Sequence, residues 1–298
     1  MASSGPAKSL DIGRAERYRL LARLVALEGR AYEDRKNLPQ AAGSYVDAIE
    51  LGQHLERGSG GIVQMLVGGA CQSIGRAGIP RVLPRLGEKA ARAAAERILR
   101  LETARPSFGW TLRMETLCGL PVPPKERGTL GAAITVAAYR LLLQGMEEAV
   151  AAPFARRPAH LLGETEKEGA VPSFQSLRNI EGPVVEAAWF YHANSRAQNG
   201  MAAVSLALRA YQLAHGAYPA SLNALVPAYL PSAPDDPFAA QPQSLRYRKQ
   251  GNGYLLYSVG PDAKDDGGRP VRKPKPGGGS LIVWFRTATG DLLPGQRL

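Results

Sequence analysis

The sequence predicts an α+β protein in which an irregular, all-helical N-terminal domain precedes a smaller α+β domain. In the first half, apolar residues recur at three- and four-residue steps, the spacing of amphipathic helices. In the last third, two β-like runs flank a Gly-Asn-Gly turn, the pattern of a hairpin. The length of 298 residues suits about two domains of ordinary size.

The boundary between the two domains is expected in a segment rich in glycine, proline and serine. Residues 163–183, GETEKEGAVPSFQSLRNIEGP, lose the apolar periodicity of the preceding helices. We therefore predict a helical domain at residues 11–165, a linker at 166–183 and an α+β domain at 184–298.

Helical spacing also defines the elements of the first domain. A helical hairpin is predicted over residues 12–55, with Asn-Leu-Pro at 37–39 as its turn. Further helices are predicted at residues 61–77, 87–102 and 129–152.

Small and aromatic residues in this hairpin have a particular spacing: Gly29 and Tyr32, then Ala41, Tyr45 and Ala48. Small residues let two antiparallel helices approach closely, and the tyrosines fill the groove between them. The pattern resembles one tetratricopeptide repeat, although about three repeats are needed to bury a continuous core. A hairpin within an irregular bundle and a peptide-binding groove are the two interpretations.

The second domain is predicted to pack one long helix against a small antiparallel sheet. The helix covers residues 184–215 and stops at Gly216, and a short helix with Leu222 and Leu225 facing inward follows it. The strands are predicted at residues 244–249, 254–259 and 281–286.

Three blocks of this domain occur in the order of a known family. They are ALRAYQLAHGAYPASLNAL at residues 207–225, DPF at 236–238 and YLLYSVGPDAKDDGG at 254–268. Together they resemble the C-terminal domain of the major pseudopilin of type II secretion, over a little more than a third of the chain. The resemblance implies a bacterial envelope protein with an assembly or binding role and an extracytoplasmic location, in the periplasm or cell envelope.

The resemblance also implies a calcium site in the loop after the hairpin. Calcium binds about six to eight oxygen atoms, which a glycine-rich loop can supply as carbonyls and carboxylates. The ligands implied here are the carbonyls of Leu256 and Ser258 and the carboxylates of Asp262 and Asp265 or Asp266.

Two departures from the family pattern bear on this calcium site. The family's later aspartate is missing near residues 280–281, and Lys264 lies inside the acidic loop. The alternative interpretation is that the three aspartates cap turns and stay solvated.

A third departure concerns polymerisation. Pilin subunits assemble through an apolar N-terminal helix that begins at a processing site of the type Gly-Phe-Thr-Leu-x-Glu. This chain has no such site ahead of the predicted helix, and His192, Asn194, Ser195 and Arg196 lie in the stretch that should be apolar. We therefore expect that the chain does not polymerise as a pilin does.

Charge and hydropathy bear on the partners. The 37 basic and 26 acidic residues give a net charge of +11, but Arg–Glu mixtures are typical of solvated helix faces and no basic-aromatic module accompanies them. We expect a protein partner and no nucleic acid. The sequence shows no signal peptide and no membrane-spanning run, so membrane association would need an anchor outside this chain.

Residues that could perform catalysis are sparse. The chain lacks the G-x-S-x-G, H-E-x-x-H and Walker A patterns, and its four histidines (His54, His160, His192 and His215) lie in separate segments. Cys71 and Cys118 lie in apolar surroundings, which favours buried thiols over a disulfide. We predict a non-enzymatic protein, with a soluble helical-repeat adaptor for a peptide or protein partner as the alternative to the envelope protein.

Overall fold

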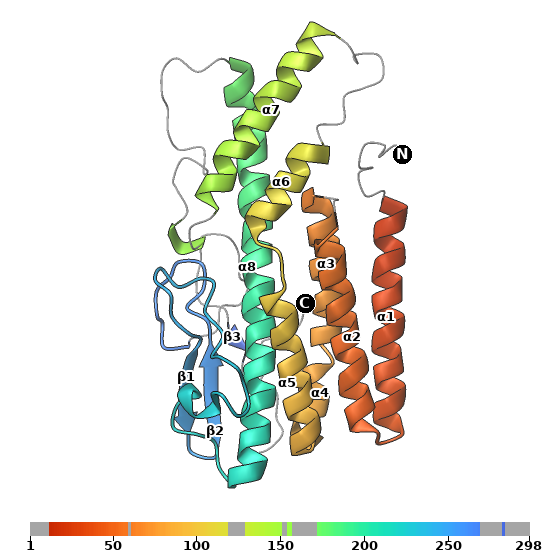
Figure 1. The fold of residues 1–298 in the computed structure, drawn as a ribbon, viewed down its shortest axis with the longest axis vertical. Helices are drawn as coiled ribbons and strands as arrows, with labels where there is room; N and C mark the ends of the chain where they lie inside the picture. The colour runs from red at the N-terminus through yellow and green to blue at the C-terminus, as the bar shows by residue number, and fades with distance from the viewer. Residues whose placement is uncertain are drawn as a thin grey trace.

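The chain is mostly helical with a small antiparallel sheet, which confirms the predicted α+β class (Figure 1). The computed structural model describes residues 12–58, 61–118, 129–150, 154–156, 172–268 and 282–283. The first elements are α1 (Ile12–Asp34), α2 (Leu38–Glu56), α3 (Gly61–Arg76), α4 (Ile79–Val82), the 3₁₀ helix η1 (Leu83–Arg85) and α5 (Glu88–Thr103). The next are α6 (Phe108–Cys118), α7 (Leu130–Ala149), η2 (Phe154–Arg156), α8 (Pro172–His215), η4 (Leu222–Leu225), β1 (Arg246–Gln250), β2 (Gly253–Tyr257) and β3 (Ile282–Val283).

The long helix α8 differs from the predicted linker and helix. Residues 166–171 of the linker lie outside the described part of the chain, and from Pro172 onward helix occupies the rest of it. Pro183 lies inside this helix, which continues to His215. A proline at an interior position removes one helical hydrogen bond, and tertiary packing on both sides of α8 can offset that loss. Local composition therefore predicted a break that does not occur.

Helix α8 is the central helix of the molecule. The hairpin β1–β2 lies along one side of it, and α3 and α5 pack against it from another (Figure 1). Buried side chains from Ala41 in α2 to Val259 after β2 form one continuous cluster. The regions predicted as separate domains at 11–165 and 184–298 thus share a hydrophobic core.

The hairpin forms around the predicted Gly-Asn-Gly turn. Strands β1 and β2 are antiparallel, with Arg246 opposite Tyr257 and Gln250 opposite Gly253. Every residue of β2, the central strand between β1 and β3, is buried. The third predicted strand is described only at Ile282–Val283, and the rest of residues 281–286 lies outside the described residues.

Helices α2 and α3 pack with their backbones in contact through glycines. A Cβ atom built on Gly52 would lie 2.3 Å from the carbonyl oxygen of Gly68, and one on Gly75 would lie 2.5 Å from that of Tyr45. Such distances are shorter than any carbon can adopt, so only glycine permits this approach. The close contact brings the polar side chains of α2 and α3 to the same level of the bundle.

We predict that Gly52→Ala destabilises the protein, because the new methyl group meets backbone that cannot move aside. The expected loss is about 1–3 kcal/mol of unfolding free energy, measured by urea denaturation. Gly43→Ala is the matched control in the same helix, since nothing lies within 4 Å of its Cβ position. That variant should gain about 0.5–1 kcal/mol from helix propensity. Equal effects of the two substitutions would contradict the packing described here.

Candidate functional site

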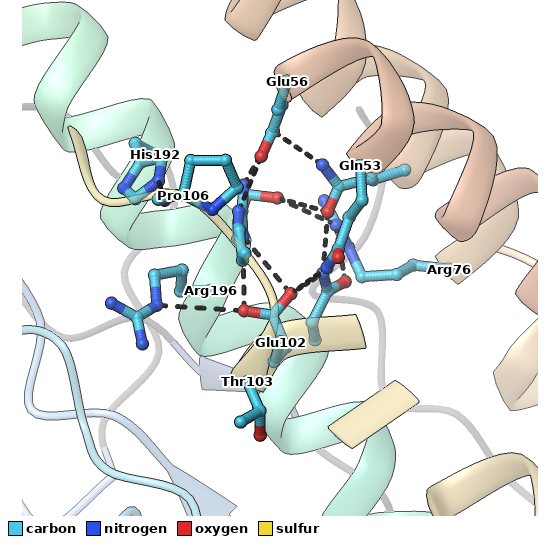
Figure 2. Close-up of polar contacts among 12 residues, drawn as sticks. Gln53, Glu56, Arg76, Glu102, Thr103, Pro106, His192 and Arg196 are labelled. Atoms are coloured by element: carbon cyan, nitrogen blue, oxygen red, sulfur yellow. Dashed lines mark hydrogen bonds and ion pairs between the residues drawn. The ribbon is translucent and has the colours of Figure 1, made fainter. Parts of the chain in front are cut away.

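A cluster of charged and polar side chains is enclosed where α2, α3, α5 and α8 meet (Figure 2). We call it the junction cluster, and its members are Gln53, Glu56, Gln72, Arg76, Glu102, Arg105, Ser195 and Asn199. The side chain of Arg105 has no exposed surface, and that of Glu56 is 2% exposed. Charges this deeply buried require partners, because an unpaired ion is costly away from water.

Arg105, just beyond the end of α5, is the centre of the junction cluster. Its Nε and Nη2 donate to the two carboxylate oxygens of Glu56 at 2.7 and 2.8 Å, a bidentate pair. Its Nη1 lies 3.4 Å from Oε1 of Glu102. Burial alone would lower the pKa of Arg105, but the carboxylates of Glu102 and Glu56 outweigh it and raise that pKa. The guanidinium is therefore held charged between two acids.

Helix α8 joins the cluster through Ser195 and Asn199. The Asn199 amide donates to Oε1 of Gln72 at 2.7 Å and accepts a hydrogen bond of 2.8 Å from Nη1 of Arg76. Arg76 also donates to the Ser195 hydroxyl at 3.1 Å. Burial, with Arg105 nearby, lowers the pKa of Arg76 to about 10. Polar residues that looked out of place in a pilin-like helix thus serve to attach α8 to the helical array.

A cleft of about 620 Å³ opens beside this cluster. Its wall contains the rings of Phe108 and Trp189, which stack with centroids 6.3 Å apart. His192 lies in the wall with its Nε2 3.2 Å from the carbonyl oxygen of Pro106. Arg196 is half-exposed in the cleft and lies 3.8 Å from Glu102.

Several charged groups of this cleft have partners within the protein. Arg113 and Glu147 form an ion pair in its lining. Burial, together with the nearby charges of Arg105 and Arg196, holds the pKa of His192 well below its usual value, so the ring is neutral. The Nε2–H of His192 donates to the Pro106 carbonyl. Among the described residues, no nucleophilic side chain is hydrogen-bonded to this ring. These contacts give His192 a structural role in the wall of the cleft.

The residues implied as calcium ligands make contacts within the protein. Leu256 and Ser258 are both buried, and the Ser258 hydroxyl donates to Asp236 at 2.7 Å. One oxygen of Asp262 accepts the backbone N–H of Lys264 at 3.2 Å, as in an Asx turn. Among the described residues, no group of three or more His, Cys, Asp and Glu side chains is placed to hold a metal ion.

Asp265 has a protein cation as its partner. Its carboxylate accepts hydrogen bonds from the Tyr257 hydroxyl at 2.7 Å, from the Gly267 N–H at 2.9 Å and from Nε of Arg246 at 3.2 Å. The hydrogen bond from Tyr257, with Arg246 alongside, holds the pKa of Asp265 below its usual value. The guanidinium of Arg246 thus lies where it would compete with a cation for this carboxylate. These contacts favour the turn-capping interpretation for Asp262 and Asp265.

Asp236 is a structural residue to which the sequence analysis assigned no role. It is 5% exposed, and its carboxylate accepts the Ser258 hydroxyl at 2.7 Å and the N–H groups of Val259 at 2.8 Å and Phe238 at 3.0 Å. Burial raises the pKa of Asp236 despite these donors. The Asp-Pro-Phe block thus ties its loop to the end of β2, and an aspartate two residues before a large apolar residue was the available signal.

The two tyrosines of the repeat-like hairpin have different environments. Tyr45 is 1% exposed, and its hydroxyl donates to Glu33, whereas Tyr32 is half-buried. A Cβ atom on Gly29 would lie 2.7 Å from the Tyr45 ring, and one on Gly78 would lie 2.3 Å from it. The ring therefore requires glycine on both sides, the role that the repeat-like pattern gives to small residues.

The outer face of α1 is unusually apolar. Leu20, Leu24 and Leu27 are 54%, 54% and 58% exposed. Beside them, a cleft of about 460 Å³ lies between α1 and the α3–α4 region. This face is a candidate binding surface, in contrast to the closed junction cluster.

Comparisons of the chain with protein-family models, with curated proteins and with solved structures find no match. The similarities to pseudopilins and to a tetratricopeptide repeat therefore rest on the residues quoted for them. Within the described ranges, none of the helices is both long enough and apolar enough to cross a membrane. Cys71 is a buried free thiol, and the side chain of Cys118 lies outside the described part.

We predict that Arg105→Met lowers the unfolding free energy by about 3–5 kcal/mol, because it leaves Glu56 buried without its cation. The double variant Glu56→Leu/Arg105→Met should lose less than the sum of the single losses. Arg92→Met is the control, since Arg92 pairs with Glu96 on the surface and should cost at most about 1 kcal/mol. Additive losses in urea denaturation would contradict a coupled pair.

We also predict that acidification destabilises the protein through His192. The folded pKa of this ring lies well below that of the unfolded chain, about 6.5, so below that pH only the unfolded state gains the proton. Stability should fall between pH 6.5 and the folded pKa by up to about 1.4 kcal/mol per pH unit. His192→Gln should lose this component in urea denaturation at pH 7 and pH 5. An unchanged pH dependence in that variant would contradict a neutral, buried ring.

Proposed function

We propose that this chain is a non-enzymatic bacterial envelope protein related to the type II secretion pseudopilins, with a binding role. The observation that carries the proposal is the position of α8, which has the hairpin on one side and the helical array on another (Figure 1). A long helix packed on a small sheet is the arrangement that the pseudopilin resemblance implies. Under this proposal, the extracytoplasmic location also follows from the resemblance.

The binding role, as opposed to polymerisation, is supported by the surroundings of α8. A pilin offers its apolar helix to neighbouring subunits. In this chain the stretch around Ser195 and Asn199 is covered by α3 and α5 and bonded to Gln72 and Arg76. The helical array thus occupies the place that neighbouring subunits would need, and a free surface elsewhere must engage the partner.

A soluble helical-repeat adaptor is the second candidate. The exposed leucines of α1 and the cleft beside them favour it, because both features suit a peptide or protein ligand. This alternative has the same binding role. It differs in the cellular location of the protein and in the role of the C-terminal unit.

We predict that the native protein is found in the periplasmic or envelope fraction of its host and sediments as a species of defined size. Fractionation of host cells, followed by immunoblotting against this chain with a cytoplasmic enzyme as marker, measures the first property. Sedimentation velocity over a range of concentrations measures the second. Protein confined to the cytoplasmic fraction would overturn the envelope proposal in favour of the adaptor, and concentration-dependent filaments would overturn the binding role.

A further inference from the structure

Three leucines form a continuous apolar line along α1. Leu20, Leu24 and Leu27 follow one another at four and three residues, so they share one helix face. We call them the α1 stripe. They lie opposite Ala22 and Gly29, which are buried against the rest of the bundle. Each leucine of the stripe exposes more than half of its surface.

The position of α1 makes this stripe more than scattered surface leucines. Helix α1 is the outer helix of the array and packs on α2 and α3 (Figure 1). The outermost helix of a stacked helical array usually presents a polar outer face, since nothing covers it. An apolar outer face is instead expected where another helix packs on the array and extends it.

The charges around the stripe indicate the chemistry of that helix. Exposed arginines on α1 make no hydrogen bond or ion pair with any other described residue, and they are Arg14, Arg17, Arg23 and Arg30. Two acidic side chains that alternate with them have partners. Glu16 pairs with Arg19, and Glu28 accepts a hydrogen bond from Ser44.

The cleft beside the stripe also combines an apolar residue with positively charged ones. Leu27, Arg23 and Arg30 line it from α1, and Arg81 lines it from α4. The acid nearest to Arg81 is Glu33, which Arg81 and Arg85 both contact, at 3.1 and 3.2 Å. The cleft therefore presents an apolar edge and an excess of positive charge.

We propose that the α1 stripe and this cleft bind an acidic amphipathic helix of a partner protein. Apolar side chains of that helix would pack on Leu20, Leu24 and Leu27, and its carboxylates would face Arg23 and Arg30. A second copy of this chain is the less favourable occupant, because each copy carries a net charge of +11. The proposal rests on the binding role proposed above and assigns its partner class.

The test uses two synthetic helical peptides with the same leucine pattern, one with glutamates and one with lysines on its flanks. Fluorescence anisotropy measures the affinity of each for the full chain at low and high salt. The glutamate peptide should bind at least about tenfold more tightly, and salt should weaken it. Arg23→Glu/Arg30→Glu and, separately, Leu24→Gln should each weaken binding of the glutamate peptide by about tenfold or more.

Matched controls carry the same chemical changes elsewhere. Arg248→Glu/Lys249→Glu reverses two exposed charges on β1, and Leu213→Gln removes an exposed leucine of α8. Neither control should change the affinity. Equal binding of both peptides, or no loss in the α1 variants, would overturn the proposal. Self-association of the free chain that Leu24→Gln abolishes would assign the stripe to a second copy and would also overturn it.

A photo-crosslinking amino acid at position 24 or at position 213 separates this proposal from the binding role itself. In host envelope extracts, a protein crosslinked from position 213 alone would overturn the assignment to the α1 stripe and leave a binding role intact. Crosslinks from neither position, together with no binding of the glutamate peptide, would overturn both.

Discussion

The bidentate ion pair between Arg105 and Glu56 is the interaction on which the arrangement of this protein depends. Both side chains are almost fully buried, and neither is stable there without the other. The pair forms only when the end of α5 meets α2, and Gln72 and Asn199 complete it from α3 and α8. The same cluster thus joins the helical array to α8, and the glycine contacts between α2 and α3 bring the polar groups into reach.

The junction cluster separates the surfaces that pack within the protein from those that remain exposed. The polar face of α8 forms part of the junction cluster, where Ser195 and Asn199 are bonded to side chains of α3. The hairpin is likewise tied down, by Asp236 and by the pairing of Arg246 with Asp265. The outer face of α1 stays exposed, and it lies far along the chain from the blocks that resemble a pseudopilin. A binding role at that face is the function most compatible with this division.

Local pattern was enough to predict the elements whose signals are local. The helices at 61–77 and 87–102, the end of α8 at His215 and the hairpin were predicted to within a residue or two. A positive φ of 74° at Gly216 explains why the helix stops there. Pro183 contributed to the prediction of a linker at this point, because local composition disfavours the helix that α8 forms there.

The candidate sites were less predictable because their partners are distant in sequence. Glu56 and Arg105 are 49 residues apart, and Asn199 meets Gln72 across 127. The periodicity of the sequence carries no information about pairs so far apart. The polar residues around Ser195 were nevertheless unusual in an otherwise apolar helix. Similarly, the sequence of the acidic loop implied calcium but did not indicate that Arg246 of β1 would contact Asp265. The leucines of α1 were identified as helical, but only the packing shows which face is buried.

Native-state hydrogen exchange of the full chain tests the central claim most directly. If the junction cluster joins the helical array to the α8–sheet unit, the slowest amides of α2, α5 and β2 open in a single cooperative unfolding with the same free energy. Two distinct opening free energies, one for α2 and α5 and a lower one for β2, would contradict it and restore the two independent domains that the sequence predicted.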